Sequence, residues 1–270
     1  MSRETGEAPA SWSMPDGVDA PLWHYTHSAR LALSEDDYFR GHPLFAADAR
    51  LLDARFVEPG RLVDLGCGAG RLSLHFARRG FRVTSVDLSG PMLATARAKA
   101  RAEGLAIDAV RANLCRMALF PQASFDDAIA MFSTIGMIRG RDNRRRALAE
   151  AFRILRPGGR LALHAHNLWL NLGDRQGRRW LIGQIWGAIL GRPGFGDRTM
   201  TYRGVAQMTV HLYRWRELRD DLHAAGFVLN EAIPLNSVTA RVIRAATILP
   251  GLRGGGWIVF ASKPAQGSGG

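Results

Sequence analysis

The segment Arg61–Arg71, which reads RLVDLGCGAGR, constrains the fold more than any other part of the chain. Its apolar residues predict a short buried β-strand that leaves its sheet near Asp64. Three glycines follow at alternate positions, and they let the backbone turn tightly and approach a ligand closely. Helical spacing of apolar residues begins at Arg71 and stops near Gly80. The segment therefore predicts a strand, a glycine-rich turn and a helix, an arrangement that binds nucleotides.

The spacing of these glycines distinguishes between two kinds of adenosine cofactor. In the dinucleotide fingerprint G-x-G-x-x-G the third glycine allows close helix packing, but Arg71 stands at that position here. The carboxylate of Asp64 would also repel a pyrophosphate, whereas it suits a ligand that carries an amino group or a sulfonium. The loop thus favours an adenosyl-amino-acid cofactor over NAD, and its Cys67 is expected to be a packed, reduced thiol.

A second acidic residue ends a second predicted strand. Phe81–Leu88 (FRVTSVDL) is largely apolar and finishes near Asp87, about one βαβ half-unit after the first strand. A carboxylate at this place can accept hydrogen bonds from both ribose hydroxyls of an adenosine. Ser89 and Pro91 predict the start of the next helix, and Met92 within it is expected to lie near the adenine.

Strands and helices continue to alternate along the chain. Strands are expected over Asp108–Leu114, Ser124–Phe132 and Arg160–Asn167, with a turn at Pro157–Gly159 and a helix over Asp142–Leu155. This rhythm predicts an α/β fold with a doubly wound parallel sheet, whose ligands bind at the carboxyl ends of the strands.

Together these motifs resemble those of the class I S-adenosylmethionine-dependent methyltransferases. The stretches VDLGCGAG, SVDLS and AFRILRPGGRLAL carry the resemblance, which covers about residues 50–165. Further on, Arg214–Gly226 resembles the last helix of that family, Phe227–Ala232 the next strand, and Gly256–Pro264 the reversed final strand. The resemblance implies a mostly parallel, seven-stranded Rossmann-like sheet over residues 57–264 and transfer of a methyl group from S-adenosylmethionine.

The resemblance also implies roles for individual residues. Asp64 and the backbone of the glycine loop would hold the methionine end of the cofactor, and Asp87 would bind the ribose. Asn113 stands where the family usually has an Asp that accepts from the adenine amino group, and an Asn carbonyl can accept the same bond. The expected cofactor-binding residues are Asp64, Gly66, Cys67, Gly68, Gly70, Asp87, Leu88, Met92, Asn113, Leu114, Met131 and Phe132.

Regions outside this core are expected to select the substrate. Residues 21–56 form a helical region rich in aromatic residues and His, which either caps the cofactor site or simply packs on the sheet. An insertion at 168–210 contains the apolar stretch Arg178–Leu190 (RRWLIGQIWGAIL) with basic flanks. This stretch is interpreted as a lid over an apolar pocket, a helix resting on a membrane surface, or an ordinary buried helix. Residues 1–20 and 265–270 are expected to be disordered.

Composition limits the partners and the compartment. The chain of 270 residues has a formal net charge of +12, but 34 of its 36 basic residues are Arg and they are spread over every predicted helix, which disfavours a nucleic-acid partner. The two cysteines, Cys67 and Cys115, predict neither a disulfide framework nor a metal site. No stretch reads as a signal peptide or a transmembrane span, so we expect a cytoplasmic protein, with peripheral membrane contact left open.

Two histidines are the leading candidates for a general base. His164 and His166 lie two residues apart, hence on one strand face, close to the edge of the sheet where ligands bind. A small-molecule acceptor is expected, because Met131–Thr134 replaces the Asn/Asp-Pro-Pro-aromatic motif of enzymes that methylate base amines. The alternatives are an RNA, lipid or quinone methyltransferase, a non-catalytic S-adenosylmethionine-binding protein, and a Rossmann oxidoreductase.

Overall fold

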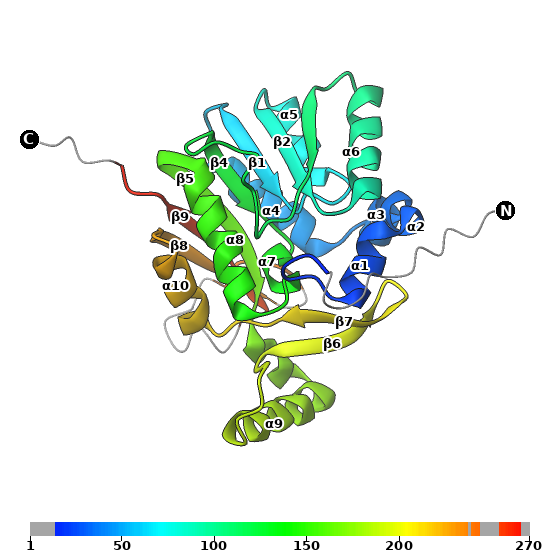
Figure 1. Ribbon diagram of the computed structural model, residues 1–270, viewed down its shortest axis with the longest axis vertical. Coiled ribbons are helices and arrows are strands. Elements are labelled where there is room, and N and C mark those ends of the chain that lie inside the picture. Colours follow the sequence, from blue (N-terminus) through cyan, green and yellow to red (C-terminus); the bar gives the residue numbers. More distant parts are fainter. Residues whose placement is uncertain (1–13, 237–238, 244–253, 266–270) are drawn as a thin grey trace, which may run out of the picture.

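A seven-stranded sheet forms the centre of the computed structural model, which describes residues 14–236, 239–243 and 254–265. The strands follow the order β3-β2-β1-β4-β5-β9-β8 (Figure 1). They are β1 (Arg61–Leu65), β2 (Arg82–Asp87), β3 (Ile107–Arg111), β4 (Phe125–Ala130), β5 (Leu155–His166), β8 (Val228–Leu235) and β9 (Gly256–Ser262). The first five strands pair in parallel, and β9 runs antiparallel to both β5 and β8. The expected doubly wound, mostly parallel sheet of seven strands is confirmed.

Two strand boundaries differ from the expectation. The third strand ends at Arg111, so Asn113 lies in the loop beyond it. The segment Pro157–Gly159, expected to be a turn, lies inside β5, and that expectation was wrong. The pairing of β4 with β5 shifts between Phe125 and Asp127, so a β-bulge absorbs the additional residues of β5 at this point.

Helices cover both faces of the sheet because adjacent strand residues point to opposite sides. Val63 belongs to the apolar cluster shared with α8 (Arg141–Ile154) and α10 (Trp215–Ala224). Its neighbour Leu62 belongs to the cluster shared with α4 (Pro43–Asp53) and α5 (Arg71–Arg78). Helix α6 (Gly90–Ala102) packs against β2 and β3. Since both faces are covered, the carboxyl ends of the strands are the natural place for a ligand.

The N-terminal region is helical, as expected. Ahead of α4 it forms the short helices α1 (Ala20–His27), α2 (Ala29–Leu33) and α3 (Glu35–Tyr38). The side chain of Asp19 accepts a hydrogen bond from the backbone of Leu22 and thereby caps the start of α1. Helix α4 packs on the sheet and also contributes Phe45 to the cavity described below, while α1 and α3 contribute further lining residues.

The folded part of the chain begins earlier than expected. The backbone N–H of Arg139 donates to the carbonyl of Gly17 at 2.8 Å, and the carboxylate of Asp16 lies 2.8 Å from the guanidinium of Arg116. The expectation that residues 1–20 are disordered is therefore wrong for residues 14–20. Residues 1–13 and most of the C-terminal tail, 266–270, lie outside the described residues.

The insertion after β5 contains a hairpin that the sequence did not predict. It forms the 3-10 helix η2 (Leu168–Gly173), helix α9 (Arg175–Ile189) and the antiparallel strands β6 (Asp197–Tyr202) and β7 (Val205–His211). Strand β7 packs against α1 and α7 (Thr134–Met137), whereas α9 projects from the opposite side of the hairpin, away from the main sheet (Figure 1). Among the helices of the described residues, none is long and apolar enough to cross a bilayer.

Candidate functional site

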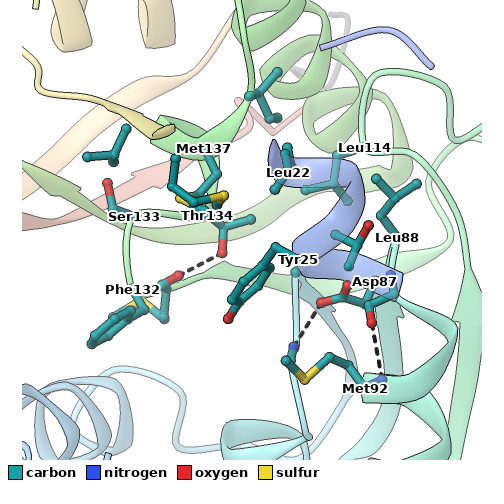
Figure 2. A pocket seen from close by; sticks show the side chains of 18 of the residues that line it. Leu22, Tyr25, Asp87, Leu88, Met92, Leu114, Phe132, Ser133, Thr134 and Met137 are labelled. Atoms are coloured by element: carbon teal, nitrogen blue, oxygen red, sulfur yellow. Dashed lines mark hydrogen bonds between the residues drawn. The ribbon is translucent and has the colours of Figure 1, made fainter. Parts of the chain in front are cut away.

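A cavity of about 440 Å³ lies at the carboxyl ends of the parallel strands. Its lining comes from the glycine loop after β1, the end of β2, the loops after β3 and β4, helices α1 and α3, and the β6–β7 hairpin. Figure 2 shows the ring of Tyr25, from α1, between Asp87 on one side and the segment Phe132–Thr134 on the other. This volume is within the range of sites that hold small molecules.

The glycine loop packs too closely against its neighbours to carry side chains at two of its positions. Gly66 has a φ of 74° and Gly68 a φ of 54°, which is the left-handed region that favours glycine. A Cβ at Gly66 would overlap the side chain of Thr134, and one at Gly68 would stand 2.5 Å from Oε1 of Glu35. The loop therefore presents bare backbone to the cavity, as a closely bound cofactor requires.

Asp87 joins the end of β2 to this loop. One carboxylate oxygen accepts from the N–H of Gly68 at 2.9 Å and the other from the N–H of Ser89 at 2.8 Å. Burial raises the pKa of Asp87, while these backbone bonds favour the ionised form. A carboxylate oxygen can accept more than one hydrogen bond, so Asp87 keeps acceptor capacity for two ribose hydroxyls.

Asp64 places a second carboxylate beside the loop. It is 3% exposed, and one of its oxygens accepts from the hydroxyl of Ser73 at 2.7 Å. Burial raises the pKa of Asp64 to about 6, so the side chain is ionised at neutral pH and protonated in mild acid. The methionine end of S-adenosylmethionine carries positive charge, and a buried anion at this place fits it.

Asn113 is held from two sides in the loop after β3. Its amide oxygen accepts from the N–H of Cys115 at 2.9 Å, and its amide nitrogen donates to the carbonyl of Asp16 at 2.9 Å. The oxygen retains one lone pair, which can accept from an adenine amino group. Figure 2 shows the apolar side chains of Leu88 and Leu114 on this side of the cavity, where an adenine ring would need them.

The cavity brings together eleven of the twelve residues expected to bind the cofactor, and only Gly70 is missing from its lining. A Cβ at Gly70 would lie 2.7 Å from that of Ala96, so this glycine lets α5 and α6 pack closely. Cys67 lines the cavity, and its burial raises the pKa of the thiol well above the usual value, which keeps it protonated.

The segment after β4 has an unusual backbone. Phe132 and Ser133 have φ values of 55° and 61°, a left-handed conformation that costs about 1–3 kcal/mol for residues other than glycine. The ring of Phe132 packs edge-on against Phe39, with 4.8 Å between ring centroids, and also contacts Phe45 and His42. Such conformations occur where a functional site fixes the chain, and here they turn the loop into the cavity.

The two candidate histidines differ in their position relative to the cavity. His166 lines the cavity, and burial together with the neighbouring His42 lowers the pKa of His166 to about 4. His164 is absent from the lining and 3% exposed, and its Nδ1 has no hydrogen-bond partner within the described part of the chain. The two rings are in edge-on contact with centroids 4.9 Å apart, so His164 supports His166 from behind.

Residues that no motif singled out close the cavity. Glu35 accepts from the N–H of Ala69 in the glycine loop at 2.9 Å. Arg203, at the tip of the β6–β7 hairpin, donates to the carbonyl of Leu31 at 2.6 Å and to the hydroxyl of Tyr25 at 3.3 Å. Burial raises the pKa of Tyr25 to about 12, so its hydroxyl stays protonated. The aromatic content of residues 21–56 was the only signal of this closure in the sequence.

No group of three His, Cys, Asp or Glu side chains in the described ranges could hold a metal ion. The polar side chains that line the cavity include those of Asp64, Asp87, Glu35 and His166.

Known proteins with similar sequences point to the same cofactor. Residues 62–159 match the family model described as a methyltransferase domain. The chain is 37% identical over 107 residues to a demethylmenaquinone methyltransferase of Thermus thermophilus, which covers 39% of this chain and 46% of that protein. It is also 37% identical over 106 residues to an S-adenosylmethionine-dependent Diels-Alderase of Talaromyces variabilis, over 38% of this chain and 35% of that protein. The chain thus spans less than half the length of these curated relatives.

A solved structure extends the similarity to almost the whole chain. The Burkholderia thailandensis 1,6-didemethyltoxoflavin N1-methyltransferase, with S-adenosylhomocysteine and its substrate bound, superposes with a TM-score of 0.60 and covers 93% of each chain at 19% identity. At that identity the likeness concerns the fold. The strand order, the glycine loop followed by Asp87 and the matching family model define an S-adenosylmethionine-binding class I fold. Residues 62–159 thus match the methyltransferase-domain family, and the strand order of the sheet is that of the class I S-adenosylmethionine-dependent methyltransferase fold.

Proposed function

We propose that the protein transfers a methyl group from S-adenosylmethionine to a small, apolar acceptor. The observation that carries the proposal is the division of one cavity into two parts. Three carboxylates stand around the glycine loop: that of Asp64 is buried, and those of Asp87 and Glu35 are half-buried. The remaining lining is mainly apolar, with contributions from Phe39, Phe132, Leu170, Met200, Met208 and Leu212.

The carboxylate part suits the cofactor. Asp87 would accept from the ribose hydroxyls, Asp64 would face the positively charged methionine end, and Asn113 would accept from the adenine amino group. Leu88, Leu114 and Met92 would flank the adenine ring. Burial raises the pKa of Glu35 as well, and its bond to Ala69 fixes the far side of the loop.

The apolar part suits the acceptor. S-adenosylmethionine supplies an activated methyl group when bound, so the protein contributes mainly position, alignment and exclusion of water. The hairpin and the N-terminal helices enclose the acceptor, with Arg203 joining them. His166 is neutral at physiological pH because its pKa is lowered, and a neutral imidazole can take the proton of an acceptor hydroxyl or amine. We therefore propose His166, and not the enclosed His164, as the candidate base.

The charge distribution supports a small molecule more than RNA. Many of the Arg residues are paired with acids of the protein itself, for example Arg55 with Glu231 and both Arg141 and Arg145 with Asp221. Such pairs consume the charge that a phosphate backbone would need.

The relatives suggest one class of acceptor and one alternative activity. The demethylmenaquinone methyltransferase suggests a quinol-type acceptor, which would match the apolar lining. The S-adenosylmethionine-dependent Diels-Alderase suggests the second candidate, an enzyme that binds this cofactor and catalyses a reaction other than methyl transfer.

Turnover with labelled S-adenosylmethionine separates these possibilities. The protein would be incubated with methyl-labelled cofactor and a panel of quinols, phenols and heteroaromatic amines, and both S-adenosylhomocysteine and methylated product would be measured. Equal amounts of the two, with at least one apolar acceptor, are expected. Tight cofactor binding without release of S-adenosylhomocysteine for any member of the panel would contradict methyl transfer and favour the second candidate.

A further inference from the structure

Helix α9 presents an apolar face to solvent. Half of the exposed large hydrophobic side chains among the described residues lie within 172–190, so they form a patch instead of being scattered. They are Leu172, Ile182, Ile185, Trp186, Ile189 and Leu190. Ile182, Ile185, Trp186 and Ile189 follow the spacing i, i+3, i+4, i+7, which places them on one side of the helix. Trp186 is 61% exposed and Ile189 is 67% exposed, whereas ordinary packing would bury such residues.

The opposite side of α9 holds the helix to the body of the protein. Leu181 is buried in a small cluster with Leu168 and Leu212, and Trp180 packs against that cluster. Gln184 accepts from the backbone of Gly196 at 3.0 Å. The exposed apolar face is thus a fixed surface on an anchored helix, and Figure 1 shows α9 standing clear of the main sheet.

The charged residues within α9 and just after it are all basic, and the acids nearest in sequence are Asp174, which caps the start of the helix, and Asp197. Arg175, Arg178 and Arg179 lie in the first turns of α9, and Arg192 follows its end, while residues 175–196 contain no Asp or Glu. Of these four arginines, none forms an ion pair within the described ranges of the chain. Positive charge at the start of a helix is unfavourable for the helix itself, because the macrodipole is positive there. Arg178 donates to the carbonyl of Leu172 at 2.9 Å, but the positive charge of all four arginines is left without an acidic partner and is available to an anionic surface.

We propose that this face of α9 rests on an anionic lipid surface. Helices that lie in a bilayer interface combine an apolar stripe, an aromatic anchor and basic residues that meet lipid headgroups. A second copy of the chain fits less well, because a self-complementary contact would bring the same unpaired arginines of both copies together. Helix α9 is too short and too polar to cross the bilayer, so it lies on the surface.

The position of α9 relates this surface to the cavity. Leu170 in η2 and Arg198 in β6 both line the cavity, and α9 lies between them in the chain. The cluster under α9 also includes Val210 of β7 and Leu212, which directly follows β7, and both line the cavity. An acceptor dissolved in the lipid would therefore be held next to the apolar wall of the site. Lipid binding itself requires neither the cofactor nor methyl transfer.

Sedimentation with vesicles tests the proposal. The intact protein would be mixed with vesicles of phosphatidylcholine alone and with vesicles that also contain phosphatidylglycerol. Binding to the anionic vesicles is expected to be at least tenfold tighter, and to weaken as salt is added. Trp186→Gln should weaken this binding about tenfold, since it removes an apolar anchor from the interface. The double variant Arg178→Gln, Arg179→Gln should weaken it by about 30-fold, from roughly 1 kcal/mol for each Arg.

Matched variants elsewhere on the surface serve as controls. Leu33→Gln removes a more exposed hydrophobic side chain on α2, and the pair Arg82→Gln, Arg101→Gln removes the same charge from exposed positions away from α9. These controls should bind vesicles as the unaltered protein does, and every variant should retain its affinity for S-adenosylhomocysteine, which reports on the fold independently.

Three results would overturn the proposal. One is no binding to anionic vesicles, and another is an equal loss of binding in the control variants, which would indicate diffuse attraction by net charge. The third is a dimer in light scattering that Trp186→Gln dissociates, because α9 would then be a contact between two copies of the chain.

Discussion

Replacing Asp87 by Asn tests how the cofactor is held. In the structure both carboxylate oxygens of Asp87 already accept a backbone N–H, one from Gly68 and one from Ser89. An Asn side chain has only one acceptor oxygen, so its NH₂ group would face one of these two donors. The variant would therefore both loosen the glycine loop and lose an acceptor for a ribose hydroxyl.

The expected size of the effect follows from these bonds. A hydrogen bond to a charged group contributes about 1.5–3 kcal/mol, and a factor of ten in affinity corresponds to about 1.4 kcal/mol. Losing one charged acceptor for the ribose should therefore raise the Kd for S-adenosylhomocysteine by about 10- to 150-fold. Disorder in the glycine loop would raise the Kd further. The prediction is therefore an increase in the Kd of at least about 10-fold.

Calorimetric titration of S-adenosylhomocysteine into both proteins measures this change. Asp108→Asn is the matched control, because Asp108 is exposed on the neighbouring strand β3 and is absent from the cavity lining. It should bind as the unaltered protein does. Thermal unfolding establishes that Asp87→Asn is folded. A folded Asp87→Asn with unchanged affinity would refute the assignment of Asp87 to the ribose.

Three further predictions concern the pH dependence, the closure and the chemistry of the cavity. Affinity for S-adenosylhomocysteine should fall as the pH drops below about 6, because Asp64 then takes up a proton, and Asp64→Asn should bind weakly at neutral pH and lack this inflection in the same titration. Arg203→Gln should lower the stability by about 3 kcal/mol, since it removes a buried cation that donates to the carbonyl of Leu31 and lies 3.7 Å from the carboxylate of Glu35, and should weaken cofactor binding; an unchanged Tm would contradict the role of Arg203 in closure. His166→Gln should lower kcat by about 100-fold with little change in cofactor affinity, and an unaltered kcat would exclude His166 as the base.

Much of the fold could be predicted from the sequence because its signals are local. The alternation of buried strands with helices and the glycines of the loop depend on neighbouring residues, and they placed β1, β2 and β4 nearly as observed, whereas β9 was expected from the family resemblance. The same locality explains why eleven of the twelve expected cofactor residues line one cavity: the carboxyl ends of parallel strands meet at the same edge of a sheet.

The remaining parts depend on contacts between residues far apart in the chain. Arg71 illustrates this. In the sequence it was notable only because it occupies the third glycine position of the dinucleotide fingerprint, and nothing there indicated its partner. In the structure it pairs with the buried carboxylate of Asp48, at 2.6 Å, and so attaches α4 to the helix that follows the loop. Arg203 lies in a hairpin with no clear strand pattern, and its partners are about 170 residues away. Helical spacing alone also could not decide whether α9 faces a cavity, a core or solvent, because all three require the same apolar residues.

The most direct test of the central claim is calorimetric titration of the purified protein with S-adenosylmethionine and S-adenosylhomocysteine, with NAD as the control ligand. The structure predicts micromolar binding of both adenosyl ligands and none of NAD, since the glycine loop faces Asp64 and Asp87 and not a site for a pyrophosphate. Binding of NAD alone, or failure of a folded protein to bind either adenosyl ligand, would contradict the assignment of this cavity.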